Sequence, residues 1–235
     1  TRSRGSSAPR RDDDASRSVL NRSESGRCLI HTVRKRHTQR EDIVFVDART
    51  APPPAEIRTD ICIVGAGAAG ITLAKEFIGK QFDVWLLESG GLEFESDVQA
   101  LYSGESVGRE YPPATTRLRY FGGSTNHWGG MCRPLDPVDF TVRKWVPHSG
   151  WPITRAELDP YYERAQTVCQ LGAYSYAAEH WQTRAARPLA MRSDRIYSPV
   201  FQYSPPTRFG QVYREELHRA SAITVLFHAN VLQFS

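Results

Sequence analysis

The sequence has no long hydrophobic run, few cysteines and no internal repeat. None of its apolar stretches approaches the roughly 18 residues that a membrane-spanning helix needs, so we expect no membrane span. The four cysteines are far apart in the sequence, with no CxxC pair and no histidine at zinc-site spacing, and they predict no metal centre. No secretory signal peptide is visible in the chain, which favours a cytoplasmic location.

Basic residues are concentrated near the N-terminus. Residues 1–40 hold eleven Lys and Arg against four acidic residues, a net charge of about +7, whereas the whole chain carries +4. This Arg/Ser-rich segment has too few apolar residues to bury a core, and we predict that residues 1–41 form a disordered basic tail. The cluster at 33–37 could touch nucleic acid or anionic lipid, but no nucleic-acid partner is expected.

The most informative stretch is 60–88. Residues 61–64 form a short apolar run rich in β-branched side chains, which is typical of a buried parallel strand. A glycine turn follows at 65–70, an amphipathic run from Ala68 to about Lys80 predicts a helix, and a second apolar strand at 84–88 ends in an acid. This order of elements is the unit that holds the ADP half of a dinucleotide.

Each part of this unit has a physical role. Gly65 makes the tight turn, Gly67 lets backbone amides approach the pyrophosphate, and Gly70 lets helix and strand pack closely. The helix N-terminus presents unpaired N–H groups to the phosphates, and Glu88 can accept hydrogen bonds from ribose hydroxyls. A lone GxGxxG can also serve packing alone, but here both strands, the helix and the acid all have the required spacing.

A second glycine-rich stretch covers 117–134, where two Gly-Gly pairs frame a small polar and aromatic patch. Such a density of glycine lets backbone lie flat against a planar ligand or a phosphate. Ser124, Thr125 and Asn126 add short hydrogen-bonding side chains, and Arg119 can pair with a pyrophosphate. Because a nucleotide unit precedes it, we interpret this stretch as a loop that closes over the cofactor rather than as an ordinary surface loop.

The chain beyond the second loop alternates helix-like and loop-like pieces. Thr154 with Glu157 three residues later predicts a capped helix, which Pro160 is expected to break. Residues 210–220 predict another helix, and 223–227 a strand that returns to the nucleotide-binding sheet. The histidines outside the second loop show no paired spacing and are expected to be surface or structural residues. Four aromatic side chains in this part are expected to belong to a core: Trp145, Trp151, Tyr161 and Tyr162.

Two motifs in this order carry a family resemblance. The GxGxxG turn with its distal Glu88, followed by Gly-Gly-Ser-Thr-Asn-His-Trp-Gly-Gly at 122–130, resembles the N-terminal half of the glucose-methanol-choline (GMC) oxidoreductases. The resemblance covers roughly residues 42–235. Further matches to bacterial members of the family are Ser-Gly-Trp-Pro at 149–152, Leu-Asp-Pro-Tyr-Tyr at 158–162, Ser-Pro-Pro-Thr-Arg-Phe-Gly at 204–210 and Ala-Asn-Val at 229–231.

The resemblance implies an α/β fold of the Rossmann-like, FAD-binding type, a doubly wound parallel sheet with only the beginning of a substrate domain. The N-terminal half of the FAD domain would cover 42–136, and 137–235 would lead into the substrate domain and return to the FAD domain. The C-terminal part of such an enzyme would be missing, and with it the catalytic His paired with His or Asn. No catalytic residue is therefore expected in this chain.

The resemblance also implies the chemistry and the contacts of the cofactor. Members of the family use FAD to oxidise an alcohol or sugar: a base takes the hydroxyl proton while the carbon delivers hydride to flavin N5. Val231 matches a position whose backbone meets the adenine, and some members bond a histidine at the position of His127 covalently to the flavin 8α-methyl group. The expected cofactor-binding residues are Gly65, Gly67, Ala68, Ala69, Gly70, Glu88, Ser89, Arg119, Gly122, Gly123, Ser124, Asn126, His127, Gly130 and Val231.

Some alternatives stay open at this point. His127 could only stack on or hydrogen-bond near the ring, without a covalent bond. The chain could also belong to a flavin or NAD enzyme of another class that shares only the ADP-binding unit, or to a non-catalytic nucleotide-binding module. The sequence does not identify the alcohol or the electron acceptor.

Overall fold

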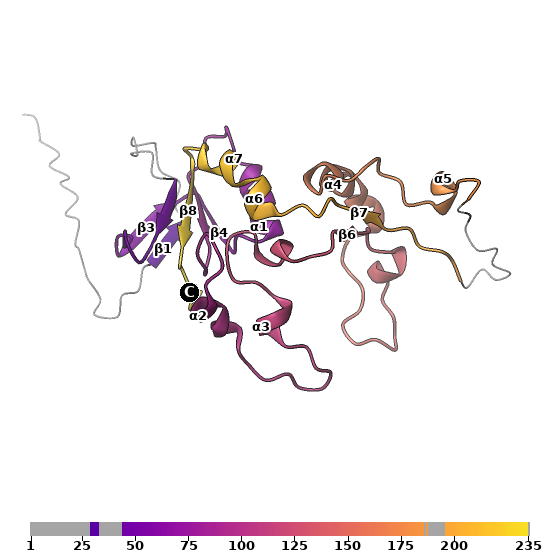
Figure 1. Cartoon of the computed structure of the whole chain (residues 1–235), viewed down its shortest axis with the longest axis horizontal. Helices are drawn as coiled ribbons and strands as arrows, with labels where there is room; N and C mark the ends of the chain where they lie inside the picture. The colour runs from indigo at the N-terminus through magenta and orange to yellow at the C-terminus, as the bar shows by residue number, and fades with distance from the viewer. Residues whose placement is uncertain (1–28, 33–43, 186, 188–195, 235) are drawn as a thin grey trace, which may run out of the picture.

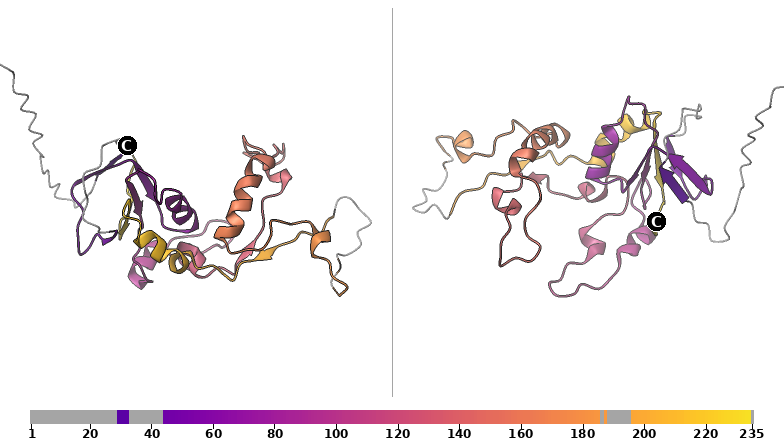
Figure 2. Two further views of the ribbon diagram at one scale, coloured as in Figure 1. Left: turned by 90° about the horizontal axis from the view of Figure 1, so that it is seen from above. Right: turned by 180° about the vertical axis from the view of Figure 1, so that it is seen from behind.

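The structure is a computed structural model that describes residues 29–32, 44–185, 187 and 196–234. Within these residues the chain has two parts, which are seen in Figure 1 and in the further views of Figure 2. The first part is a parallel sheet with short helices packed on it. The second part extends to one side of the sheet and carries α4 (Arg155–Val168), α5 (Ala178–Trp181) and the pair of β6 (Met131–Cys132) with β7 (Gln202–Tyr203).

The main sheet has four parallel strands in the order β2–β8–β5–β4. They are β2 (Phe45–Asp47), β8 (Ile223–Phe227), β5 (Val84–Leu87) and β4 (Ile61–Val64). Every residue of β5 and β8 is buried, because both faces of these strands are covered, and their sequences are accordingly apolar except for Thr224. The prediction of an α/β fold with a parallel, Rossmann-like sheet is confirmed, including the return of 223–227 to that sheet.

A second, two-stranded parallel sheet pairs β1 (Leu29–Thr32) with β3 (Glu56–Thr59). These four residues of β1 lie within the segment that was predicted to be a disordered tail, and the structure corrects the prediction there. The edge of β3 offers backbone N–H and C=O groups that need partners, and β1 supplies them. The rest of the predicted tail, including the basic cluster at 33–37, lies outside the described residues.

Helix α1 (Ala68–Lys75) begins at the predicted residue but is shorter than predicted. The amides that follow it donate to carbonyls three residues back, as Phe77 does to Ala74, so the helix tightens into three-residue turns. Gly79 then adopts a φ of 73°, a left-handed conformation that ends the run before Lys80.

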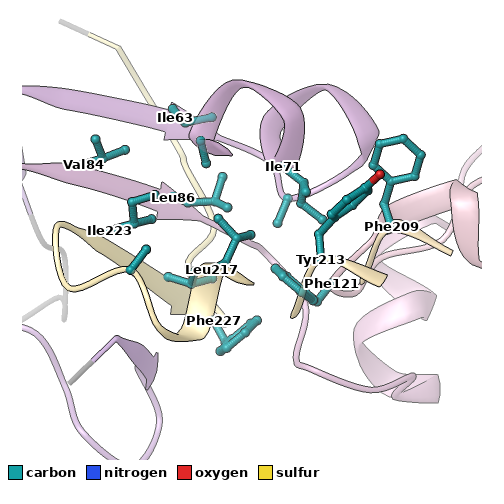
Figure 3. Close-up of a cluster of buried hydrophobic side chains, with 14 residues drawn as sticks. Ile63, Ile71, Val84, Leu86, Phe121, Phe209, Tyr213, Leu217, Ile223 and Phe227 are labelled. Carbon is teal, nitrogen blue, oxygen red and sulfur yellow. The ribbon is translucent and has the colours of Figure 1, made fainter. Parts of the chain in front are cut away.

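The core lies between one face of the sheet and helices α1, α6 (Phe209–Val212) and α7 (Arg214–His218). Figure 3 shows Ile71 and Leu217 pointing toward one another from the helices, and both are completely buried. A single helix was predicted over 210–220, but the structure breaks it at Tyr213. The Tyr213 ring packs in the core, and its hydroxyl donates to the Val168 carbonyl at 2.5 Å.

The second part of the molecule is built around α4 (Arg155–Val168). The predicted capping box is present: the Glu157 amide donates to Thr154 Oγ1, and the Glu157 carboxylate accepts from the Thr154 amide at 2.7 Å. The predicted break at Pro160 is wrong, because a proline in the second turn removes only one helical hydrogen bond and the remaining turns continue. The remaining short elements are α2 (Ser96–Gln99), η1 (Ala100–Tyr102), α3 (Pro113–Thr116), η2 (Gly123–Asn126), β6 (Met131–Cys132), η3 (Pro137–Phe140), α5 (Ala178–Trp181) and β7 (Gln202–Tyr203).

The aromatic residues of this part do not form a core. Trp145 is 80% exposed, Trp151 58% and Tyr161 61%, while Tyr162 is half-buried. Helix α4 buries only Gln166 of its own residues, so it lacks an apolar layer against which these rings could pack. The prediction that they are core residues is therefore wrong for the three exposed rings. Within the described part of the chain, no helix combines the length and apolar character needed to cross a membrane.

Candidate cofactor site

The first glycine turn joins β4 to α1 through closely packed backbone. Gly65 has a φ of 93°, and its amide donates to the Leu87 carbonyl at 2.7 Å. A Cβ on Gly70 would lie only 1.8 Å from the Gly65 carbonyl oxygen, so no other residue fits there. A Cβ on Gly67 would meet nothing within 4 Å, which leaves the backbone at the start of α1 open on that side.

The N-terminus of α1 has free hydrogen-bond donors. Gly67 caps the helix without any side-chain hydrogen bond. The first amide of the helix that has an acceptor is that of Ile71, which donates to the Gly67 carbonyl. Among the described residues, nothing accepts from the amides of Ala68, Ala69 or Gly70. Free amides at the positive end of a helix dipole are suited to bind a phosphate.

Glu88 ties the end of β5 to this turn. The side chain is only 5% exposed; one carboxylate oxygen accepts from the Ala66 amide at 2.9 Å, and the other accepts from the Gly90 amide at 2.8 Å and from the Ser89 hydroxyl at 3.3 Å. A carboxylate has roughly four lone-pair sites, so these contacts leave capacity for one more donor. The predicted hydrogen bond to a ribose hydroxyl stays a prediction.

The second glycine loop packs directly on the first. The Gly122 amide donates to the Ala66 carbonyl at 2.8 Å, with Gly122 at a φ of 96°. A Cβ on Gly123 would lie 3.1 Å from the Gly67 Cα, and one on Gly122 would lie 2.6 Å from the Gly210 nitrogen. The two stretches that the sequence singled out, more than 50 residues apart, therefore meet at the N-terminus of α1.

Three polar side chains of the second loop hold the loop itself. Asn126 donates to the Phe121 carbonyl at 2.9 Å, Thr125 donates to the Gly122 carbonyl at 2.6 Å, and Ser124 accepts from the Leu118 amide at 3.3 Å. Ser124 and Asn126 were predicted as cofactor contacts. In the structure both side chains form hydrogen bonds to the backbone of their own loop, and their remaining donors and acceptors stay available to a ligand.

His127 is exposed at the end of the short helix η2. Its amide donates to the Ser124 carbonyl at 3.3 Å, but its imidazole has no hydrogen-bond partner among the described residues. The next residue, Trp128, is anchored by its indole N–H, which donates to the Thr207 carbonyl at 2.9 Å. Gly130 follows with a φ of 75°, and a Cβ there would lie 2.6 Å from the Ser204 carbonyl oxygen.

The segment 204–210 braces this loop from the far end of the chain. One guanidinium nitrogen of Arg208 donates to the carbonyls of both Thr125 and Trp128, at 2.8 and 2.9 Å. The Phe209 amide donates to the Thr125 hydroxyl at 3.2 Å. Sequence reasoning missed this role. The only signal in the sequence is the Ser-Pro-Pro-Thr-Arg-Phe-Gly run at 204–210, which contributes to the family resemblance but assigns no contact to Arg208.

Arg119, predicted to pair with pyrophosphate, lies beside the end of β8. Its guanidinium donates to the Asn230 side chain and stacks 4.9 Å from the centre of the Tyr102 ring. Its Nε is buried and has no hydrogen-bond partner among the described residues. The free amides of α1 and the open side of Gly67 fit a phosphate-bearing cofactor, whereas the guanidinium of Arg119 contacts Asn230 and Tyr102.

The segment after β8 runs alongside Glu88. The His228 amide donates to the Gly90 carbonyl at 3.0 Å, and the Ala229 amide donates to the Glu88 carbonyl at 2.9 Å. This pairing brings Val231, which is 37% exposed, to the part of the chain that follows β5. The predicted contact of its backbone with adenine stays a prediction.

His228 is held by two carboxylates, as expected of a structural histidine. Its Nδ1 lies 3.0 Å from Asp47 and its Nε2 2.7 Å from Glu95, and the side chain is 8% exposed. Hydrogen bonds from Arg49 hold the pKa of Asp47 down at about 2 and lower that of Glu95. Among the described residues, no group of three or more His, Cys, Asp or Glu side chains is arranged to hold a metal ion.

The chain is similar to three proteins whose names state an activity. It is 32% identical over 176 residues to 6'''-hydroxyparomomycin C oxidase of Streptomyces lividus, covering 63% of this chain and 32% of that protein. It is 29% identical to paromamine 6'-oxidase of Streptomyces fradiae (55% and 27% covered). It is also 27% identical to 2-methyl-1,2-propanediol dehydrogenase of Mycolicibacterium austroafricanum (47% and 24% covered). No family model matches the chain.

The alignments thus reach no more than about a third of the length of these relatives. All three relatives are oxidoreductases by name: two are oxidases and the third is the dehydrogenase of a diol. The chain is similar to these proteins at a low level of identity.

Proposed function

We propose that the full-length protein is an FAD-dependent oxidoreductase of the GMC type, which oxidises a CH–OH group of a small alcohol or sugar. In this proposal, residues 42–235 supply the cofactor-binding part. The observation that carries it is the meeting of the two glycine loops at the donor-rich N-terminus of α1. The similarity to two oxidases and a diol dehydrogenase supports the reaction class.

Each end of the dinucleotide would be held by residues of this chain. The amides of Ala68 and Ala69, which have no acceptor among the described residues, would bind the pyrophosphate, and Arg119 is the charged side chain predicted to pair with it. The remaining lone pair of Glu88 would accept from the ribose, and the backbone at Val231 would contact the adenine. When bound, FAD would supply the hydride acceptor for the alcohol carbon.

The second glycine loop would cover the flavin side of the site. Its backbone at Gly122 and Gly123 approaches the first loop too closely for any side chain, so the cofactor would meet backbone there. The imidazole of His127, which is exposed and has no hydrogen bond among the described residues, would contact the isoalloxazine ring, and we propose that it bonds to the 8α-methyl carbon. That bond would replace the imidazole N–H and one methyl C–H, and dioxygen would accept the two electrons and two protons released, as hydrogen peroxide.

The proton-accepting base of the reaction would lie outside this chain. The histidines beyond the second loop that the structure shows are not paired with one another, and His228 is committed to two carboxylates. The short span of the alignments agrees with a chain that holds the cofactor part of a larger enzyme.

The test is to purify the full-length protein and to identify any bound chromophore. We expect a yellow protein with a flavin absorption band, release of FAD or of a His127-flavin peptide after denaturation and proteolysis, and bleaching of the band when an alcohol substrate is added without oxygen. Paromamine and 2-methyl-1,2-propanediol, which the names of two relatives give as substrates of those enzymes, are the first substrates to try. A colourless protein that does not take up added FAD would contradict the proposal, and retention of NAD instead would favour another enzyme class.

A further inference from the structure

A single side chain fixes the backbone on both sides of His127. The carbonyl of Thr125, two residues before the histidine, and that of Trp128, directly after it, accept from the same Nη1 atom of Arg208 at 2.8 and 2.9 Å. We infer that Arg208 is a positioning residue, which sets where the His127 imidazole meets the flavin. This inference rests on the proposed function and adds to it a residue more than 80 positions away in the sequence.

The position of the His127 imidazole depends on the backbone that carries it. His127 is exposed and has no side-chain hydrogen bond among the described residues, so the backbone of the turn alone determines where it lies. Bond formation requires reacting atoms to approach to about 3–3.5 Å in the right direction, and a misplacement of about 1 Å can cost a factor of about 100 in rate. A turn fixed at both ends meets this need.

The bond of Arg208 to the loop is not easily replaced by water. Thr125 is 8% exposed and Arg208 is half-buried, so removing the guanidinium leaves a carbonyl unsatisfied where little water reaches. Three other hydrogen bonds attach the same segment to the loop: the Trp128 indole N–H donates to the Thr207 carbonyl, the Phe209 amide to the Thr125 hydroxyl, and the Ser204 amide to the Gly130 carbonyl. These contacts would keep the loop in place, but they hold only one side of the histidine each.

Positioning and simple bracing predict different results. If Arg208 only stabilises the loop, its loss lowers folding stability and total bound flavin together. If it positions His127, its loss leaves FAD bound through the first glycine turn but lowers the share that is covalently attached. Lysine keeps the charge and three donors on a flexible stem without the planar fork of arginine, so it should restore part of the attachment.

The experiment uses the full-length protein and three variants. Arg208→Met removes both hydrogen bonds and Arg208→Lys keeps the charge. Arg219→Met is the matched control, because the Arg219 side chain is 76% exposed and its ion pair is with Glu215, one helical turn away. Total flavin is measured by absorbance. Covalent flavin is measured on acid-precipitated protein, with the modified peptide identified by mass spectrometry, and amide exchange of residues 121–130 reports on the loop.

We expect the covalent share in Arg208→Met to fall about tenfold or more, with total flavin and thermal stability much less affected. Arg208→Lys should lie between this variant and the wild type, Arg219→Met should match the wild type, and amide exchange of 121–130 should quicken only in the Arg208 variants. If Arg208→Met does not fold, the covalent share of flavin in Arg208→Lys decides between positioning and bracing.

Wild-type covalent attachment in the Arg208 variants would overturn the inference and leave the proposed function intact. A parallel loss of flavin and stability in both variants would also overturn it, in favour of simple bracing. A yellow wild-type protein whose flavin is fully extractable would contradict the covalent bond at His127, and with it the positioning role of Arg208. A colourless wild-type protein would overturn the proposed function as well.

Discussion

The two parts of the molecule are held together by different forces. In the sheet part, Ile71, Leu86 and Ile223 are completely buried, and the short helices pack on one continuous apolar layer. In the part around α4, large apolar rings such as Trp145 are exposed, and side-chain hydrogen bonds join the helix to its neighbours. The difference shows that the two glycine loops rest on a complete core, whereas the part around α4 leaves large side chains exposed.

Polar networks give the second part its order. Arg155 bonds to Asp159 at 2.8 Å and to the Tyr174 hydroxyl at 2.9 Å, and that hydroxyl donates to Asp159 at 2.6 Å. Gln166 reaches across to the Gly172 carbonyl at 3.0 Å. Such exposed or half-buried bonds contribute about 1 kcal/mol each or less, so substitutions here should cost much less than substitutions in the sheet part.

The largest effect is expected at Gly70. A Cβ there would lie 1.8 Å from the Gly65 carbonyl oxygen, and neither backbone segment can move without disturbing the sheet. We expect Gly70→Val to cost about 4 kcal/mol or more of unfolding free energy, or to prevent folding. Urea unfolding of the full-length protein measures this. Gly104→Ala, where a Cβ meets nothing within 4 Å, is the control and should be close to neutral.

A direct contrast between the two parts comes from a pair of truncations. Leu217→Ala should cost about 2–5 kcal/mol, because it opens a cavity in a core where this side chain has no exposed surface. Trp145→Ala removes a larger side chain that is 80% exposed and should change stability by about 0.5 kcal/mol or less. Equal losses for the two variants, in the same urea titration, would contradict the contrast.

The cap of α4 should have an intermediate effect. Thr154→Ala removes the hydroxyl that accepts from the Glu157 amide, and we expect a loss of about 1 kcal/mol. Thr154→Ser keeps the acceptor and should be close to wild type. Thermal unfolding of the two variants, followed by circular dichroism, separates the lost cap from a general effect of substitution.

The smallest effect is expected for the pH dependence of folding stability, which depends on the cluster of Asp47, Glu95 and His228. Arg49 and His228 lower the pKa of Asp47 from 3.8 to about 2, chiefly through the hydrogen bond from Arg49. The ionised Asp47 therefore adds stability that is fully present above about pH 4 and is lost as the pH falls toward 2. Asp47→Asn should be less stable than wild type at pH 6, and the difference should shrink at pH 3. A difference in stability between Asp47→Asn and wild type that grows toward low pH would contradict this prediction.

The sequence predicted the parts of the fold whose determinants are local. The strand at 223–227 is a β-branched apolar run, and the turn between Gly65 and Gly70 follows from glycine spacing alone. The brace from Arg208 could not be predicted, because its acceptors are backbone carbonyls about 80 residues away and carry no sequence signal. The exposure of Trp145 could not be predicted either, since burial depends on what packs across from a side chain.

The central claim is that the first glycine turn binds FAD, and Gly67 tests it most directly. A Cβ at this position meets nothing within 4 Å and the backbone has an ordinary φ, so Gly67→Val should leave the protein folded while its side chain blocks the pyrophosphate. We predict one bound FAD per chain in the full-length wild-type protein, and a loss of FAD affinity of tenfold or more in Gly67→Val at unchanged stability (about 1.4 kcal/mol of binding free energy or more). Equal FAD binding by the folded variant, or no FAD in the wild type, would contradict the account.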